Sequence, residues 1–238
     1  MDGSLTYLSR QLRPAALTPK AHAGRRLQLS DGEQELSEEE VAGWFAGKTF
    51  GYDWTSGHFS TWASLLARYR DVPARVIEVG SWEGRSALFF LNYLPQSTLV
   101  CIDTFEGSEE HRAYPENFSK DLSEIEQRFD ANLATFADRL EKRKASSAAA
   151  LAELGIDGSR FDIAYIDGSH RAADVYSDGV LTWSMLVSGG IMIFDDYEWE
   201  YMREPRSEPK LGIDSFLRAF EGQYRLIHKS FQVAIERL

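Results

Sequence analysis

The chain has a single cysteine, an excess of acids over bases, and no long apolar run. Cys101 has no second cysteine for an intrachain disulfide, and the setting we expect is a reducing cytoplasm. The 26 basic side chains against 37 acidic ones give a net charge of −11, without a basic cluster that could follow a phosphate backbone. We therefore expect no nucleic-acid partner. No apolar run nears about 18 residues and the N-terminus has no apolar export segment, so we expect no membrane association.

The length and composition fit one α/β domain behind an N-terminal extension. The chain has 238 residues, of which 43% are hydrophobic, enough for a sizeable core. We divide it into an arm with a capping helix, residues 1–49, and a main domain, residues 50–238. Residues 1–35 are polar and show little periodicity, whereas Ser37 to Glu40 form a capping box that opens a short helix.

Strand-like and helix-like patterns alternate along the main domain. This alternation predicts a mostly parallel sheet, and two terminal strands add an antiparallel edge. Strands are predicted near residues 76–79, 99–103, 142–145, 161–167, 191–195, 224–228 and 231–237. Among the predicted helices, the one over residues 174–186 is expected to end at Gly189 and Gly190, a glycine pair that suits a left-handed stop.

The most informative segment is Val76 to Ser86, which reads VIEVGSWEGRS. A β-branched run carries Glu78 near its end, glycines follow at 80 and 84, and an apolar helix-like run comes next. The pattern predicts a strand, a glycine turn and a helix, where a ligand approaches bare backbone and unpaired N–H groups. Asp103 ends a second buried strand about 20 residues later, where a doubly wound fold places the carboxylate that holds a ribose. We therefore predict a site for a nucleoside-containing cofactor.

The glycine spacing indicates which cofactor binds. A dinucleotide site uses G-x-G-x-x-G because its backbone touches a pyrophosphate. This chain has E-x-G-x-x-x-G instead, with Trp82 where a middle glycine would stand. The carboxylate of Glu78 suits a cationic amino-acid ligand and repels a pyrophosphate. These features favour S-adenosylmethionine, and the segment resembles the class I S-adenosylmethionine-dependent methyltransferases.

Three acids and one histidine follow two later strands. Asp167 and His170 stand at the end of one predicted strand, and Asp195 and Asp196 at the end of the next. Parallel strand ends converge, and clustered carboxylates repel one another unless a cation or protons join them. Oxygen ligands without soft donors predict Mg²⁺, and the imidazole predicts a general base. An aspartate at a strand end can also cap the next helix, and for Asp196 both roles stay open.

Taken together, the later motifs resemble a more specific family. YIDGSH at 165–170, DGVLTW at 178–183 and GGIMIFDD at 189–196 are similar to the metal-dependent sugar O-methyltransferases of the macrocin and mycinamicin type, and to their small stand-alone relatives. The resemblance covers roughly residues 50–238. It implies a Rossmann-like class I methyltransferase fold, an α/β fold with a seven-stranded, mostly parallel sheet of order 3-2-1-4-5-7-6 and helices on both faces.

The resemblance also implies roles for individual residues. Cofactor contacts are expected at Glu78, Gly80, Ser81, Gly84, Ser86, Asp103, Thr104, Ser147 and Asp167. The expected metal ligands are Asp167, Asp195 and Asp196, and the expected catalytic residues are His170, as general base, and Asp167. The chain departs from the macrolide enzymes at Asp195, where they have a glutamate.

We therefore predict an S-adenosylmethionine-dependent O-methyltransferase, assisted by Mg²⁺, that acts on a hydroxyl of a small molecule such as a sugar, a polyketide or another secondary metabolite. One rival is an NAD-dependent oxidoreductase, disfavoured by the missing third glycine. A second is a non-catalytic S-adenosylmethionine-binding protein, disfavoured by the retained acids and His170. Methyl transfer to nitrogen or carbon, the identity of the acceptor and assembly into a homo-oligomer stay open.

Overall fold

A single seven-stranded sheet organises the chain. The computed structural model describes residues 36–108, 111, 122–199 and 208–238. The strands are β1 (Arg75–Val79), β2 (Thr98–Asp103), β3 (Leu140–Lys144), β4 (Phe161–Ile166), β5 (Leu186–Phe194), β6 (Tyr224–Lys229) and β7 (Val233–Arg237). Their order is β3-β2-β1-β4-β5-β7-β6, which confirms the predicted order. The first five strands are parallel, and β7 runs antiparallel to both β5 and β6.

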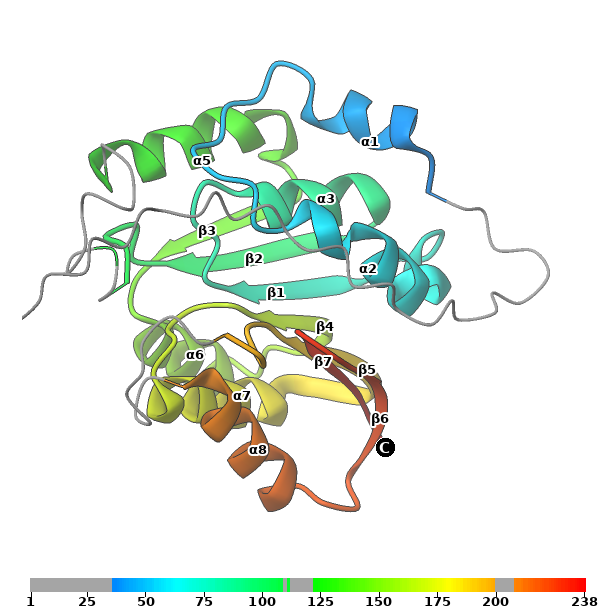
Figure 1. Ribbon diagram of the computed structural model, residues 1–238, viewed down its shortest axis with the longest axis vertical. Helices are drawn as coiled ribbons and strands as arrows, with labels where there is room; N and C mark the ends of the chain where they lie inside the picture. The colour runs from blue at the N-terminus through cyan, green and yellow to red at the C-terminus, as the bar shows by residue number, and fades with distance from the viewer. Residues whose placement is uncertain (1–35, 109–110, 112–121, 200–207) are drawn as a thin grey trace, which may run out of the picture.

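Helices cover both faces of this sheet (Figure 1). One face carries α1 (Glu38–Phe45), α2 (Phe59–Leu66), α3 (Arg85–Tyr93) and α5 (Ile125–Leu133), and the other carries α6 (Ser147–Ile156), α7 (Ala172–Met185) and α8 (Pro209–Ala219). Each face has its own buried cluster. Trp62, Phe89 and Phe90 lie in the first cluster, and Phe161 and Phe216 lie in the second. Because β1 is covered on both faces, its residues are buried continuously from Val76 to Val79 rather than alternately.

The N-terminal helix begins where the sequence predicts. The side chain of Ser37 accepts a hydrogen bond from the Glu40 N–H at 3.1 Å and caps α1. Residues 1–35 of the predicted arm lie outside the described residues. The division at residues 49 and 50 therefore stays a prediction. Among the helices of the described ranges, none is long and apolar enough to span a bilayer.

The prediction that Gly189 and Gly190 end a helix is wrong. Helix α7 ends at Met185, and Leu186 is already extended and paired with Phe161 of β4. The pairing shifts register before it resumes at Ile163 and Ile191. The two glycines lie in this irregular stretch of β5, where Gly189 has a φ of 79°. The two glycines therefore allow a bulge within β5. From the sequence alone, such a glycine pair looks the same as the end of a helix.

Candidate active site

The turn between β1 and α3 uses backbone conformations that favour glycine. Gly80 and Gly84 have φ angles of 87° and 80°, and Trp82 between them has a φ of 46°. A Cβ on Gly80 would lie 1.9 Å from the carbonyl oxygen of Asp167, and one on Gly84 would lie 2.8 Å from Leu133 Cδ1. Protein atoms already fill the space that a side chain would occupy at either position, so packing alone requires glycine at 80 and 84. Gly80 also places the turn against the loop after β4.

The carboxylate of Asp103 binds this turn directly. Its Oδ2 atom accepts hydrogen bonds from the backbone N–H groups of Ser81 at 2.8 Å and Trp82 at 2.7 Å. Burial raises the pKa of Asp103, and the backbone N–H donors oppose that rise. The residue predicted to hold a ribose therefore also holds the cofactor turn in place.

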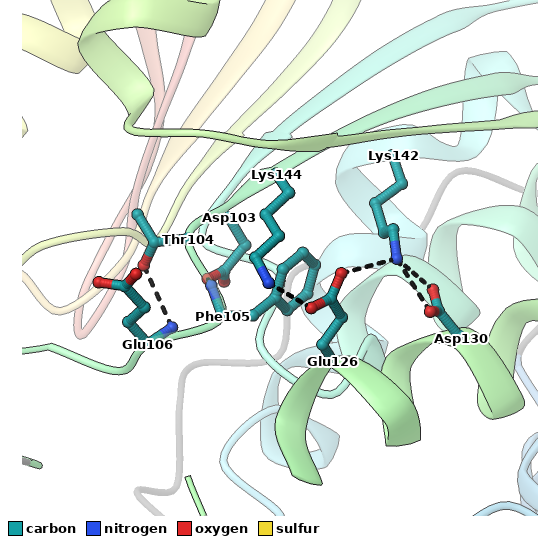
Figure 2. A network of polar contacts seen from close by, with 8 residues as sticks. All are labelled: Asp103, Thr104, Phe105, Glu106, Glu126, Asp130, Lys142 and Lys144. Carbon is teal, nitrogen blue, oxygen red and sulfur yellow. Dashed lines mark hydrogen bonds and ion pairs between the residues drawn. The ribbon is translucent and has the colours of Figure 1, made fainter. Parts of the chain in front are cut away.

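The loop after β2 folds back on the same carboxylate (Figure 2). The Phe105 N–H donates to Asp103 Oδ1 at 2.6 Å, and Phe105 has a left-handed φ of 56°. Thr104 Oγ1 accepts a hydrogen bond from the Glu106 N–H at 3.3 Å. Left-handed backbone at a non-glycine residue is strained, and such strain concentrates at functional sites.

An ion-pair network fixes the edge of the sheet next to this loop. Figure 2 shows Lys142 and Lys144 of β3 reaching towards α5. Lys142 Nζ lies 3.1 Å from Glu126 Oε1 and 2.6 Å from Asp130 Oδ1, and Lys144 Nζ lies 2.5 Å from Glu126 Oε2. Asp103 and Lys144 are register partners on β2 and β3. The network therefore holds α5 over the strand ends where a ribose is expected.

Glu78 is fully buried inside β1, next to the turn. Cys101 Sγ lies 3.2 Å from its Oε2 atom. Burial raises the pKa of Glu78 to about 7, and the nearby hydroxyls of Ser81 and Ser86 oppose that rise. A buried carboxylate of this kind would be stabilised by a cationic ligand.

Ser147 begins α6, one residue after Ser146 caps it. Burial raises the pKa of Asp178 on α7 to about 6, and the Ser147 hydroxyl opposes the rise. Asp178 lies next to Gly168 of the loop after β4, where an added Cβ would be 3.6 Å from Asp178 Oδ2. Ser147 follows β3 and thus lies at the carboxyl ends of the strands, next to an acid, and its contact with adenine stays a prediction.

A second group of acids lies at the ends of β4 and β5. Asp167 follows β4, and Asp195 and Asp196 follow β5. The Tyr165 hydroxyl lies 3.0 Å from Asp167 Oδ2 and also donates to Asp195 Oδ2. The other oxygen of Asp195 accepts the Asp196 N–H at 2.7 Å. Asp196 has a left-handed φ of 60°. Trp82 after β1 and Phe105 after β2 are also left-handed, and such strained backbone concentrates at functional sites.

His170 closes this group of acids. Its Nε2 atom lies 2.8 Å from Asp196 Oδ2, and its ring packs on Trp199 with centroids 4.3 Å apart. One ligand atom from each of Asp167, His170 and Asp196 can be chosen so that all lie within 4.8 Å of one another. Asp195 stands behind this set, hydrogen-bonded to Tyr165.

The electrostatics of these acids fit a bound cation. Burial, followed by the charges of Asp195 and Asp196, raises the pKa of Asp167 far above its usual range. Burial and the charge of Asp196 likewise raise the pKa of Asp195. Among the described residues, no lysine or arginine is paired with Asp167 or Asp195. A hard divalent cation suits this donor set of carboxylates with one imidazole.

The structure thus brings the predicted residues into two adjacent groups and adds others. The turn group joins Glu78, Gly80, Ser81 and Asp103, and the acid group joins Asp167, Asp195, Asp196 and His170. Tyr165 was not among the residues predicted from the sequence, because it reads as a buried strand residue. Asp167 follows two residues later, directly after β4, and lies within reach of the Tyr165 hydroxyl. His58 was given no role from the sequence. Its ring stacks on Phe231, burial lowers its pKa, and the charge of Asp196 opposes that lowering.

Comparisons with known proteins identify the family and the fold of the chain. The methyltransferase domain family matches residues 77–197, just over half of the chain. No curated protein is a significant match. Similar solved structures include MycE, a methyltransferase of the mycinamycin biosynthetic pathway, in complex with Mg, SAH and mycinamycin VI. It has 16% identity and a TM-score of 0.56, with 84% of this chain and 53% of MycE covered.

Two further structures are alike in fold. An O-methyltransferase from Bacillus cereus in complex with SAH has 17% identity and a TM-score of 0.56, with 84% of this chain and 90% of that chain covered. The O-methyltransferase NovP has 18% identity and a TM-score of 0.56, with 70% and 73% covered. At these identities the likeness concerns the fold, and the chain spans about half the length of MycE.

The chain belongs to the methyltransferase domain family. Its seven-stranded sheet, in the order 3-2-1-4-5-7-6, is the Rossmann-like fold of the class I S-adenosylmethionine-dependent methyltransferases.

Proposed function

We propose that the protein is an S-adenosylmethionine-dependent O-methyltransferase, assisted by a divalent cation, that acts on a hydroxyl of a small molecule. One observation carries the proposal: the acids and His170 at the ends of β4 and β5 directly adjoin the cofactor turn, because Gly80 packs on the backbone of Asp167. This arrangement would place an activated acceptor oxygen next to a methyl donor.

S-adenosylmethionine would lie along the ends of β1, β2 and β4. Its methionine part would meet Glu78 and the turn, its ribose would meet Asp103 and Thr104, and its adenine would meet Ser147. The full proposed set is Glu78, Gly80, Ser81, Gly84, Ser86, Asp103, Thr104, Ser147 and Asp167. The donor set fits this ligand, because buried carboxylates favour its ammonium and sulfonium charges.

A magnesium ion would be held by Asp167 and Asp196, with Asp195 behind them. When bound, it would neutralise these acids and lower the pKa of an acceptor hydroxyl. Support comes from the mutual repulsion of the acids and from the magnesium in the MycE complex, a protein of similar fold. His170 adjoins the same carboxylates, so the geometry also allows it to serve as a metal ligand. The variant His170→Ala distinguishes a ligand from a general base.

His170 would act as general base. Its Nε2 atom already faces Asp196, and Trp199 holds the ring in a fixed plane. Removing the acceptor proton as the oxygen attacks the methyl group contributes about 10²–10⁴-fold in rate. Positioning of donor and acceptor in line by the two groups of residues would supply much of the remaining acceleration.

The acceptor would be a hydroxylated small molecule, such as a sugar, a polyketide or another secondary metabolite. A metal-assisted mechanism favours oxygen over nitrogen or carbon, because oxygen is the harder ligand. We propose a cytoplasmic enzyme that needs neither nucleic acid nor a membrane, and whether it forms a homo-oligomer stays open. These proposals rest on the composition of the chain.

The proposal is tested by binding first and turnover second. Calorimetry should show binding of S-adenosylmethionine and S-adenosylhomocysteine and no binding of NAD. Transfer of a labelled methyl group should then be measured across sugars, phenols and amines, with and without EDTA. Binding of NAD alone, or label on amines with full activity in EDTA, would contradict the proposal.

A further inference from the structure

The hydroxyl of Tyr165 joins the ends of the two strands that carry the acids. It lies 3.0 Å from Asp167 Oδ2 and donates to Asp195 Oδ2. Tyr165 lies on β4 and Asp167 follows two residues later, directly after the strand ends, so their side chains leave the chain on the same side. Asp195 follows β5, the neighbouring parallel strand. One neutral group therefore contacts two carboxylates from different strands.

The ring of Tyr165 is fixed, and so is its hydroxyl. The residue is fully buried. Its ring meets Trp62 edge-on with centroids 5.1 Å apart, and Phe90 edge-on at 5.6 Å. Such close aromatic packing leaves few alternative rotamers. The hydroxyl is therefore presented at a defined point between the acids.

The contact extends from Asp195 to Asp196. Asp195 Oδ1 accepts the backbone N–H of Asp196 at 2.7 Å, and Asp196 adopts a left-handed conformation with a φ of 60°. Hydrogen bonds thus link Tyr165 to Asp195 and Asp195 to Asp196. Asp196 in turn belongs to the cluster with Asp167 and His170. If the hydroxyl were absent, the carboxylates of Asp167 and Asp195 would lose their shared donor and would be free to turn apart.

We propose that Tyr165 is a positioning residue whose hydroxyl orients Asp167 directly, and Asp196 through Asp195, for binding a divalent cation. The proposal rests on the metal-assisted function argued above. Hydrogen-bond partners of metal ligands fix ligand orientation, and their loss costs about 10–100-fold in metal affinity or activity. Tyr165 contributes no charge and would not touch the cation itself.

The test replaces only the hydroxyl, with Tyr165→Phe. The matched control is Tyr93→Phe, because Tyr93 is also buried and its hydroxyl donates to the Ala63 carbonyl at 2.7 Å, within the helical layer and outside the proposed site. Binding of Mn²⁺ and Mg²⁺ alone is measured by calorimetry on each protein loaded with S-adenosylhomocysteine. The dissociation constant of S-adenosylhomocysteine and the melting temperature are measured alongside.

We expect Tyr165→Phe to raise the dissociation constant of the cation about 10–100-fold, with S-adenosylhomocysteine affinity unchanged and a melting temperature close to that of Tyr93→Phe. Unchanged cation affinity in a folded Tyr165→Phe would overturn the proposal. Joint loss of cation and cofactor binding, or an equal loss of cation binding in Tyr93→Phe, would also overturn it, since each indicates a general structural effect. A wild-type protein that binds no divalent cation would refute the metal-assisted function itself.

Discussion

The imidazole of His170 and the carboxylate of Asp196 are 2.8 Å apart, although they come from different strand ends. Asp196 reaches this position from a left-handed backbone conformation, which costs energy in a residue other than glycine. The parallel pairing of β4 with β5 brings the two residues together. The pair gives the proposed base a fixed orientation and a negative partner.

Replacing His170 with alanine separates its possible roles. As general base, its loss should lower kcat about 10²–10⁴-fold and leave cofactor and cation affinities within about twofold. Kinetics and calorimetry on the same preparation provide the measurement. A parallel fall in cation affinity would instead make His170 a ligand, and a near-normal kcat would exclude it as the base.

Glu78 should make the stability of the protein depend on pH. Its pKa is raised from 4.5 to about 7 in the folded state, so the folded protein binds more protons than the unfolded chain between these values. The associated stabilisation is present below about pH 4.5 and is lost as the pH rises through about 7, an effect on the order of 3–4 kcal/mol.

The melting temperature of Glu78→Gln, minus that of the wild type, should therefore increase as the pH rises from 5 to 8. Taking this difference removes the contributions of the other raised acids, Asp103, Asp167, Asp178 and Asp195, which the variant retains. A difference in melting temperature that does not change with pH would contradict the buried, titrating Glu78.

The glycine at position 84 should be required for packing. Gly84→Ala would meet Leu133 and Phe129 and would also adopt an unfavourable φ. Gly158 provides a matched control, because its φ is 72° and nothing lies within 4 Å of an added Cβ. We expect Gly158→Ala to cost about 1–2 kcal/mol, and Gly84→Ala to cost clearly more in denaturant unfolding. Equal costs would show that backbone conformation alone selects glycine at 84.

Asp103 should affect both stability and cofactor affinity. Asp103→Ala leaves the N–H groups of Ser81, Trp82 and Phe105 without their acceptor, at a cost of about 1–3 kcal/mol in unfolding free energy. S-adenosylhomocysteine should bind more weakly, because the turn loosens and the proposed ribose partner is lost. Normal stability with weak binding would assign Asp103 to the ligand alone.

Much of the fold and the outline of the site could be predicted from the sequence. Alternating patterns indicated the sheet, and the convergence of parallel strand ends placed Asp167, His170 and Asp196 together. Local sequence does not specify which partner a polar group finds in space. Two such contacts depend on strand register: the hydrogen bonds from the turn to Asp103, and the position of the Tyr165 hydroxyl between two acids. The helix end predicted at Gly189 was wrong because bulges and helix stops use the same left-handed conformation.

The central claim is that the acids at the ends of β4 and β5 hold a cation needed for methyl transfer. The most direct measurement is the rate of labelled methyl transfer to an accepted hydroxyl substrate after treatment with EDTA and after Mg²⁺ is restored, with S-adenosylhomocysteine affinity measured in both states. We predict that turnover stops in EDTA and returns with Mg²⁺, while cofactor affinity changes little because Glu78 and Asp103 lie in the adjacent group. Full turnover in excess EDTA would contradict the claim.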